Sequence, residues 1–487
     1  MKAFVAVSLA VAAGIFAFAI AAGLLGSLPA SFLIGAVAAG LAGWRAWTRP
    51  IVDAHEASGS EALKILSGVL TCAALAQLAR LTVFMVDPGQ VAYSTVPGSG
   101  WEVRHSCLSA YFVAGQAAGE GKDVYDAALY TERSDTGIGQ RKALMLGPFG
   151  IDVYEYPPPF LLVPRVCRLL TTDFYRMRAL WFGLSGAVVL FAMLVVTRRL
   201  GPEAGARALL LLPVFWAGPA MASTLQKGNI QPVVIALAML AMILFERRRN
   251  AAGGALLAYA IVAKLYPGML GVYLLGRRQW RAAAWTAAMG VVLLALTLVD
   301  VGVPSFAAFM HHLPGLLSGE AFPAFRNAGA QAINISIPGL VFKAGLFGVP
   351  GMGFGASKIL GWIYTIVVVW ATMRAAQRAP SDHEKPLVWM AILTLATLRS
   401  PFLPQTYGVL PGLWILTLLA ATHAPTAKTL SLAVLAGVVL NIHWPLDWAM
   451  DPRVRAALNG LPQGATIALA VLGLRRRVEP EPSTLSA

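Results

Sequence analysis

The sequence is short of charged residues. Only 13% of its 487 residues are Asp, Glu, Lys or Arg, whereas 57% are hydrophobic. Soluble domains carry about 25% charged residues, so this chain lacks the charge needed to coat a water-exposed surface of its size. The shortage argues against a soluble enzyme and indicates a protein that places most of its surface in lipid.

Cysteine and metal-binding motifs are scarce too. The three cysteines, Cys72, Cys107 and Cys167, are odd in number and widely spaced, which argues against a disulfide framework or a zinc site. The HExxH, GxSxG and P-loop patterns are absent. His311 and His312 are adjacent, so on a helix they diverge, and we count no nearby carboxylate partner. We therefore expect no metal site and assign no certain cofactor.

The sequence is rich in long runs of apolar residues. A bilayer core needs roughly 20 residues of helix, and the backbone in lipid must satisfy its own hydrogen bonds. The alternating pattern of a membrane barrel is absent. The sequence predicts an all-α polytopic membrane protein with about 12–14 hydrophobic helices. These are expected near 3–25, 28–47, 64–86, 176–197, 204–222, 229–246, 251–276 (broken at "AKLYPG"), 280–302, 338–347, 357–378, 386–400, 405–422, 427–445 and 459–475, with an amphipathic surface segment from Ser109 to Ala118.

The net charge of +15 is concentrated in short basic clusters at helix ends, for example at 247–249 and 475–477. This is the pattern of the positive-inside rule, and it requires no nucleic-acid partner. It predicts a bacterial-type inner (plasma) membrane protein with a cytoplasmic N-terminus and C-terminus, and polar loops on the outer side. The expected parts are two extra N-terminal helices with a cytoplasmic loop (1–63), a membrane domain (64–475) with a long extracytoplasmic loop (87–157), a second outer loop (303–336) and a cytoplasmic tail (476–487).

Two ionisable residues stand at or near the outer ends of apolar segments. They are Lys264 in "AKLYPG" and Arg399 in "LRSPF". Ionisable side chains in such places are functional-site hypotheses, and both suit an anionic ligand group. Snorkelling to the lipid headgroups is the alternative. In "LQKGNIQP", Gly228 and Asn229 fit the start of a helix, where free N–H groups attract anions; an ordinary polar turn is the alternative.

The end of the long loop combines carboxylates with tyrosines. In "DVYEYPPPF", Asp152 and Glu155 alternate with Tyr154 and Tyr156. Aromatic rings stack on sugars and carboxylates bind their hydroxyls, so the segment fits a sugar-binding cleft. An aromatic belt at the membrane interface is the alternative.

The order of these motifs resembles glycosyltransferase family 87, the polyprenol-phosphate-dependent mannosyltransferases with a GT-C fold. The resemblance runs from about 64 to 475. Its strongest stretch begins at "LQKGNIQP" and continues through the basic turn to "AKLYPG" and "GRRQW"; "YEYPPPFLLVPR", "NISI" and "RSPFLPQTY" also match family motifs. Cys107 or His105 stands where the family usually has an Asp.

The resemblance implies transfer of a hexose, mannose first, from a polyprenyl-phosphate-linked donor to a glycolipid or cell-envelope glycan on the extracytoplasmic face. One carboxylate or histidine would act as general base, and cations would hold the donor phosphate. The candidates for general base are Glu102, His105, Asp152 and Glu155. The expected phosphate-binding residues are Lys264, Tyr266, Arg399, Lys227 and Asn229, and the expected sugar- or acceptor-binding residues are Tyr154, Tyr156, Asn334 and Ser336.

Two other functions use similar features. A lipid-linked sugar transporter or flippase also has broken helices with charges in the membrane, although we see no internal repeat. A non-catalytic partner in envelope assembly would tolerate loss of Lys264 or Arg399.

Overall fold

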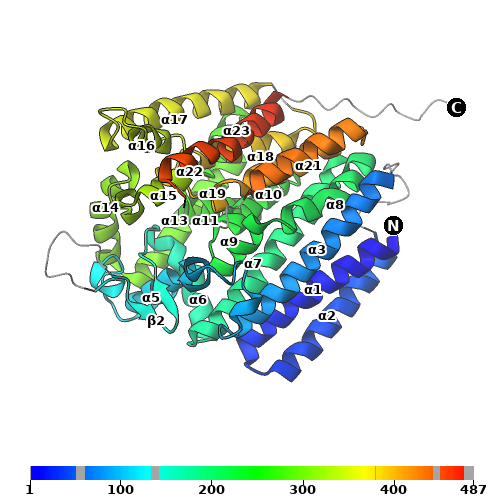
Figure 1. Ribbon diagram of the computed structural model, residues 1–487, viewed down its shortest axis with the longest axis horizontal. Helices are drawn as coiled ribbons and strands as arrows, with labels where there is room; N and C mark the ends of the chain where they lie inside the picture. The colour runs from blue at the N-terminus through cyan, green and yellow to red at the C-terminus, as the bar shows by residue number, and fades with distance from the viewer. Residues whose placement is uncertain (1, 51–60, 133–141, 379, 443–449, 476–487) are drawn as a thin grey trace.

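The computed structural model describes residues 2–50, 61–132, 142–378, 380–442 and 450–475 (Figure 1). Among them, seven helical stretches are long and apolar enough to cross a membrane. They are α1 (Lys2–Leu25), α2 (Leu28–Thr48), α3 (Glu61–Val86), α7 (Phe174–Thr197) with its 3₁₀ extension η4 (Arg198–Leu200), α13 (Trp280–Val301), α17 (Phe354–Gln377), and α22 (Pro452–Leu458) continued by α23 (Gly460–Arg475). The protein is thus an all-α, multi-pass membrane protein, as the composition predicts.

Shorter and bent apolar helices complete the bundle. The sequence predicts one helix over 204–222, but the structure divides it into two helices at an angle of 63°. Pro219 at the start of the second helix explains the break, because proline restricts the preceding residue and removes an N–H donor. The pair is α8 (Pro202–Trp216) and α9 (Pro219–Lys227), and the shorter apolar helices are α10 (Gln231–Glu246), α11 (Asn250–Ala263), α18 (Lys385–Thr397), α19 (Gln405–Gly408), α20 (Leu410–Ala421) and α21 (Ala427–Asn441).

The predicted break at "AKLYPG" is confirmed. Helix α11 ends at Ala263, and α12 (Gly268–Gly276) begins at the glycine of the Pro-Gly pair, with Pro267 as its N-cap. The breaking residues therefore stand between two short helices, and Lys264 is the residue that directly follows α11.

The core of the bundle consists of α10, α18 and α20. All of α18 except Lys385 is buried, and so are 12 of the 16 residues of α10 and 11 of the 12 residues of α20. Helices that are apolar on all sides belong inside a bundle, and their lengths of 12 to 16 residues fit an interior position surrounded by longer helices.

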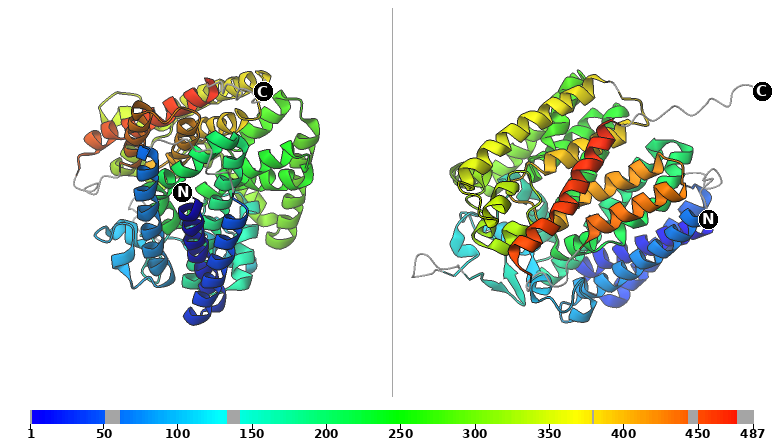
Figure 2. Two further views of the ribbon diagram at one scale, coloured as in Figure 1. Left: turned by 90° about the vertical axis from the view of Figure 1, so that its right-hand side faces the viewer. Right: turned by 45° about the horizontal axis from the view of Figure 1, so that its top comes forward.

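Helix α1 is closely packed on the rest of the chain, and α2 packs mainly on α1. Helices α1 and α2 lie together at one edge of the molecule (Figure 2), and α1 packs against α3 and α7. Gly183 and Gly186 of α7 let the helices approach, because a Cβ at Gly186 would lie 2.2 Å from the Phe16 ring. Small residues at such crossings are typical of membrane helices.

The polar segment between α3 and α7 folds into short elements of its own. It contains η1 (Val91–Tyr93), α4 (Gly100–Arg104), β1 (His105–Ser106), α5 (Cys107–Gly119), η2 (Ala127–Leu129), β2 (Met145–Leu146), β3 (Phe149–Ile151), η3 (Pro158–Leu161) and α6 (Leu162–Leu170). The strands form a small sheet in the order β1-β3-β2, with β1 parallel and β2 antiparallel to β3. Helix α5 was expected at the membrane surface, but ten of its residues are buried, so it is an interior element of this segment.

The second predicted loop, 303–336, is largely helical. It contains α14 (Val303–Ser318), η5 (Pro323–Arg326) and α15 (Ala328–Ile333), and it is followed by α16 (Gly339–Leu346). These helices were not predicted from the sequence. Helix α14 contains Pro314 in its interior and ends before Gly319, which has a positive φ of 91°.

The bundle has two chemically different ends. Arg199, just past α7, pairs with Asp382 at 3.7 Å, and Arg277, just past α12, donates to the carbonyl of Ala376 near the end of α17. We call this the basic end. The polar segment with α5 and the sheet lies at the opposite side, which we call the loop end (Figure 1).

Candidate active site

Three polar segments meet at the loop end. They are the start of the first polar segment (Ser99–Cys107), the "QKGN" turn between α9 and α10, and the stretch after β3 that begins with Asp152. Contacts between these segments, described below, place most of the residues expected from the sequence in one neighbourhood.

Glu102 and Lys227 form a buried ion pair. The Lys227 Nζ lies 2.6 Å from Glu102 Oε1, and the two side chains are 5% and 7% exposed. Ser223 Oγ donates to the other carboxylate oxygen at 2.8 Å, and Gln226 Nε2 donates to the Glu102 carbonyl at 2.7 Å. Both oxygens of Glu102 are therefore engaged by α9. The pair fastens the first polar segment to α9.

The "KGN" turn has a conformation that requires glycine. Gly228 has a φ of 69°, and a Cβ there would lie 2.9 Å from the Cβ of Leu108 in α5. Its carbonyl accepts a hydrogen bond from Trp181 Nε1. Asn229 then accepts from the backbone N–H of Gln231 at the start of α10 and donates its amide to Cys107 Sγ at 3.4 Å.

His105, Cys107 and Asp152 form a compact group. The parallel pairing of β1 with β3 holds His105 opposite Gly150, two residues before Asp152. The His105 Nε2 lies 3.6 Å from Asp152 Oδ2 and 3.7 Å from Cys107 Sγ. Burial opposes protonation of His105, but the Asp152 carboxylate and the Cys107 sulfur outweigh it, so the pKa of His105 is raised.

Glu155 is a half-buried carboxylate next to this group. Its burial and the nearby Asp152 charge raise the pKa of Glu155 well above its usual range, while the positive charge of Lys264 acts in the opposite direction. Lys264 Nζ itself lies 5.3 Å from the centre of the Tyr156 ring, a distance typical of a cation–π contact. Lys264 therefore lies beside Tyr156, and its positive charge acts on the Glu155 carboxylate of the first polar segment.

Tyrosines surround this neighbourhood. The hydroxyl of Tyr111 in α5 donates to the hydroxyl of Tyr156 at 2.9 Å, and Tyr125 donates to the Tyr156 carbonyl. Tyr154 is buried and donates to the Pro157 carbonyl. These bonds fix the tyrosines in place, and Tyr156 remains partly exposed beside Lys264.

Asn334 and Ser336 are placed differently. Both are completely buried. Asn334 accepts from the N–H groups of Ser336 and Leu403 and donates to the Pro401 carbonyl, and Ser336 also donates to that carbonyl. Their side chains join the "NISI" segment to the segment that contains Pro401 and Leu403. In the structure, both residues therefore connect two loops by hydrogen bonds.

Arg399 and Tyr266 also lie to one side. Arg399 Nε donates to Thr365 Oγ1 at 2.6 Å, and the guanidinium lies 5.8 Å from the Trp362 ring. These contacts go to α17 rather than to the group around Lys264. Tyr266 is next to Thr397 of α18. The expectation that Arg399 and Lys264 hold one phosphate together therefore has no contact in the structure to support it.

Cys107 and Tyr407 belong to this neighbourhood but were not among the sequence candidates. Cys107 contacts His105, Asn229 and the hydroxyl of Tyr407, which lies 3.4 Å from its sulfur. The His-x-Cys spacing could have indicated the cysteine, because alternate residues of a strand face the same side. Nothing local in the sequence indicates Tyr407, which lies 300 residues away.

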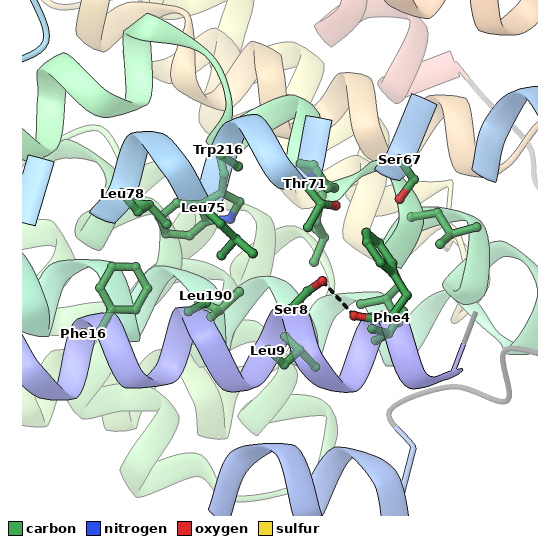
Figure 3. A pocket seen from close by; sticks show the side chains of 17 residues that line it. Phe4, Ser8, Leu9, Phe16, Ser67, Thr71, Leu75, Leu78, Leu190 and Trp216 are labelled. Atoms are coloured by element: carbon green, nitrogen blue, oxygen red, sulfur yellow. Dashed lines mark hydrogen bonds between the residues drawn. The ribbon is translucent and has the colours of Figure 1, made fainter. Parts of the chain in front are cut away.

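A large apolar pocket lies elsewhere. It has about 610 Å³ of empty volume between α1, α3, α7 and α8, and Phe16, Leu78 and Trp216 are among the side chains that line it (Figure 3). None of the candidate residues belongs to this pocket, and its lining has little polar surface. It has the character of a lipid-facing groove and offers no groups for acid–base chemistry.

Comparison with known proteins identifies the family of the chain. The family model described as glycosyltransferase family 87 matches residues 154–401, just over half of the chain. The matched segment is shorter than the 64–475 expected from motifs. It begins at Tyr154 and includes Glu155, Lys264 and Arg399, whereas Glu102, His105 and Asp152 precede it. No curated protein and no solved structure matched the chain. With the polar site at one end of an apolar helix bundle, this match shows that the chain is a membrane glycosyltransferase and belongs to glycosyltransferase family 87.

Proposed function

We propose that this enzyme transfers a hexose, with mannose the first choice, from a polyprenyl-phosphate-linked donor to a glycolipid or cell-envelope glycan at the extracytoplasmic face of the membrane. The observation that carries the proposal is the position of Lys264. Its ammonium stands at a break between two short apolar helices and beside Tyr156 and Glu155. A cation at such a place suits the phosphate of a lipid whose chain lies in the bilayer.

The direction of the chain in the membrane supports an extracytoplasmic site. Arginine clusters gather at the basic end, where cytoplasmic loops are expected to carry Lys and Arg. Lys264 lies beside Tyr156 of the first polar segment, and this segment is at the loop end (Figure 1). Nucleotide sugars are cytoplasmic, so a donor used there must already be attached to a lipid that has crossed the membrane.

Glu155 is the general base in this proposal. Among the four candidates it is the one inside the family match. Both oxygens of Glu102 are engaged by Lys227 and Ser223, and Asp152 is paired with His105. A carboxylate with a raised pKa is suited to take a proton from a sugar hydroxyl near neutral pH, and Lys264 can stabilise the departing phosphate.

The test is sugar transfer by the purified protein with a panel of polyprenyl-phosphate sugars, with products identified by mass spectrometry. Lys264→Met should reduce transfer by about 10²–10³-fold, the scale seen when a charge-stabilising donor is removed. Lys343→Met is a matched control, because Lys343 is also a poorly exposed lysine but contacts Gln463 at 3.4 Å instead of the site. It should retain activity.

The outcomes separate the competing functions. Equal activity of the two lysine variants would refute the role of Lys264. No transfer with any donor, together with movement of a labelled lipid between leaflets, would refute the enzyme and support a flippase.

A further inference from the structure

The geometry points to a transition-metal site, zinc by its donor set, formed by His105, Cys107 and Asp152. One ligand atom from each residue lies within 4.8 Å of the others. A tetrahedral zinc ion with bonds of about 2.0–2.3 Å needs neighbouring donors about 3.4–3.6 Å apart. The His105–Asp152 and His105–Cys107 distances of 3.6 and 3.7 Å are already close to that spacing.

The backbone holds these ligands in register. His105 and Cys107 flank Ser106, so they project to the same side of the chain, and β1 pairs with β3 through Ser106 and Ile151. Asp152 follows Ile151 directly, and its N–H donates to Ser109 Oγ. Two segments far apart in sequence are thus fixed against each other. Only side-chain adjustments are needed to close the three donors on an ion.

Neighbouring groups orient the ligands. The Trp101 ring stacks on His105 with centres 4.4 Å apart and planes within 15°. The Cys107 sulfur has two polar neighbours at 3.4 Å, the amide of Asn229, which donates to it, and the hydroxyl of Tyr407, which can donate. Hydrogen bonds to ligand atoms fix their direction and tune the metal in known sites.

The type of ion follows from the donors. A thiolate with an imidazole favours zinc or another late transition metal over Mg²⁺ and Ca²⁺, which prefer oxygen ligands. The thiolate and the carboxylate of Asp152 would neutralise a divalent ion. Lys227, whose positive charge also acts on His105, is itself paired with Glu102.

Three protein ligands leave a coordination position open. Structural zinc sites usually have four protein ligands, whereas catalytic sites have three and hold water or substrate in the fourth position. The Asp152 side chain is 37% exposed, so the group is accessible from one side. An ion there could polarise an acceptor hydroxyl or a water molecule. Metal binding itself does not depend on the proposed transfer reaction, whereas this role does.

The test is metal binding by the full-length protein purified in detergent. After dialysis, mass spectrometry of the metal content should give about one zinc per chain, the expectation for one three-ligand site. Replacement by Co²⁺ should give a thiolate-to-cobalt charge-transfer band. Cys107→Ser should abolish that band and weaken zinc binding by roughly 10-fold or more. Cys167→Ser is the matched control, because Cys167 is a buried free cysteine of α6, and it should keep both signals.

If the Cys107→Ser protein fails to fold, its size-exclusion profile will show this. His105→Asn, which removes another of the three ligands, is then tested in its place. The inference is overturned if the wild-type protein binds neither Zn²⁺ nor Co²⁺, or if the Cys107→Ser protein binds them as well as the wild type. Metal binding without sugar transfer would contradict the proposed function alone, whereas undiminished sugar transfer by a metal-free protein would contradict the role of the ion in the reaction and leave the proposed function standing.

Discussion

The buried pair of Glu102 and Lys227 gives the sharpest prediction of stability. Glu102→Gln keeps an acceptor for Ser223 but removes the charge that neutralises Lys227. The Lys227 side chain is 5% exposed and its ammonium lies 2.6 Å from the carboxylate, so little water can replace its partner. We expect the first polar segment to separate from α9 more easily in this variant.

The magnitude follows from the burial of both charges. Removing one partner of a buried ion pair costs about 3–5 kcal/mol, because the other charge is left uncompensated. Lys227→Met should cost a similar amount, since it strands the Glu102 carboxylate. The double variant Glu102→Gln/Lys227→Met leaves no buried charge, so it should cost less than either single variant.

The assay is equilibrium unfolding by SDS in mixed micelles, measured for the wild type and the three variants. Because the double variant should cost less than either single variant, the coupling free energy should exceed the smaller single cost, which is about 3 kcal/mol, and so lie at or above the top of the range for residues in contact. Sugar transfer per folded molecule is measured in parallel. Additive costs would refute the reasoning about burial. Wild-type stability of Glu102→Gln combined with loss of transfer would instead identify Glu102 as the base.

Three further predictions concern the base and two loop positions. Burial and the Asp152 charge raise the pKa of Glu155. A general base must be unprotonated, so kcat/KM should rise as the pH increases through this pKa and should be low at pH values below it. Glu155→Gln should remove this pH dependence and lower the rate by about 10²–10⁴-fold. An unchanged pH profile would contradict this role. Gly228→Ala should lower the free energy of unfolding by about 1–2 kcal/mol or more, because the φ of residue 228 is 69° and the new Cβ would meet Leu108. Wild-type stability of this variant would argue against the observed turn. Asn334→Ala should lower the free energy of unfolding by about 1–3 kcal/mol for each backbone partner left unpaired in the interior, as measured by the same unfolding assay. A loss of sugar transfer with no loss of stability would instead place Asn334 in substrate binding.

The helical bundle was largely readable from the sequence. Long apolar runs fix where helices can cross a bilayer, and Pro and Gly residues mark where they stop, as at the break between α11 and α12. The sequence missed the bend after α8 and the helices within 303–333, because propensity and hydropathy do not report how neighbouring helices pack.

The candidate site was only partly readable. Lys264 and Glu155 were identified because a charge beside lipid is costly and a carboxylate among tyrosines is unusual. Their proximity, together with the contacts of Asn334 and Arg399 elsewhere, depends on the arrangement of distant segments. The same is true of Cys107, whose neighbour Tyr407 is 300 residues away.

The sequence by itself determined that this protein is a helical membrane protein, because the composition leaves too few charges to face water. It also determined the kind of enzyme, through motifs that the family match bears out. The tertiary structure alone decided which polar residues meet. Hydrogen-bond and ion-pair geometry is set by the packing of α5, α9 and β3, and this packing joins Glu102 to Lys227 and His105 to Asp152.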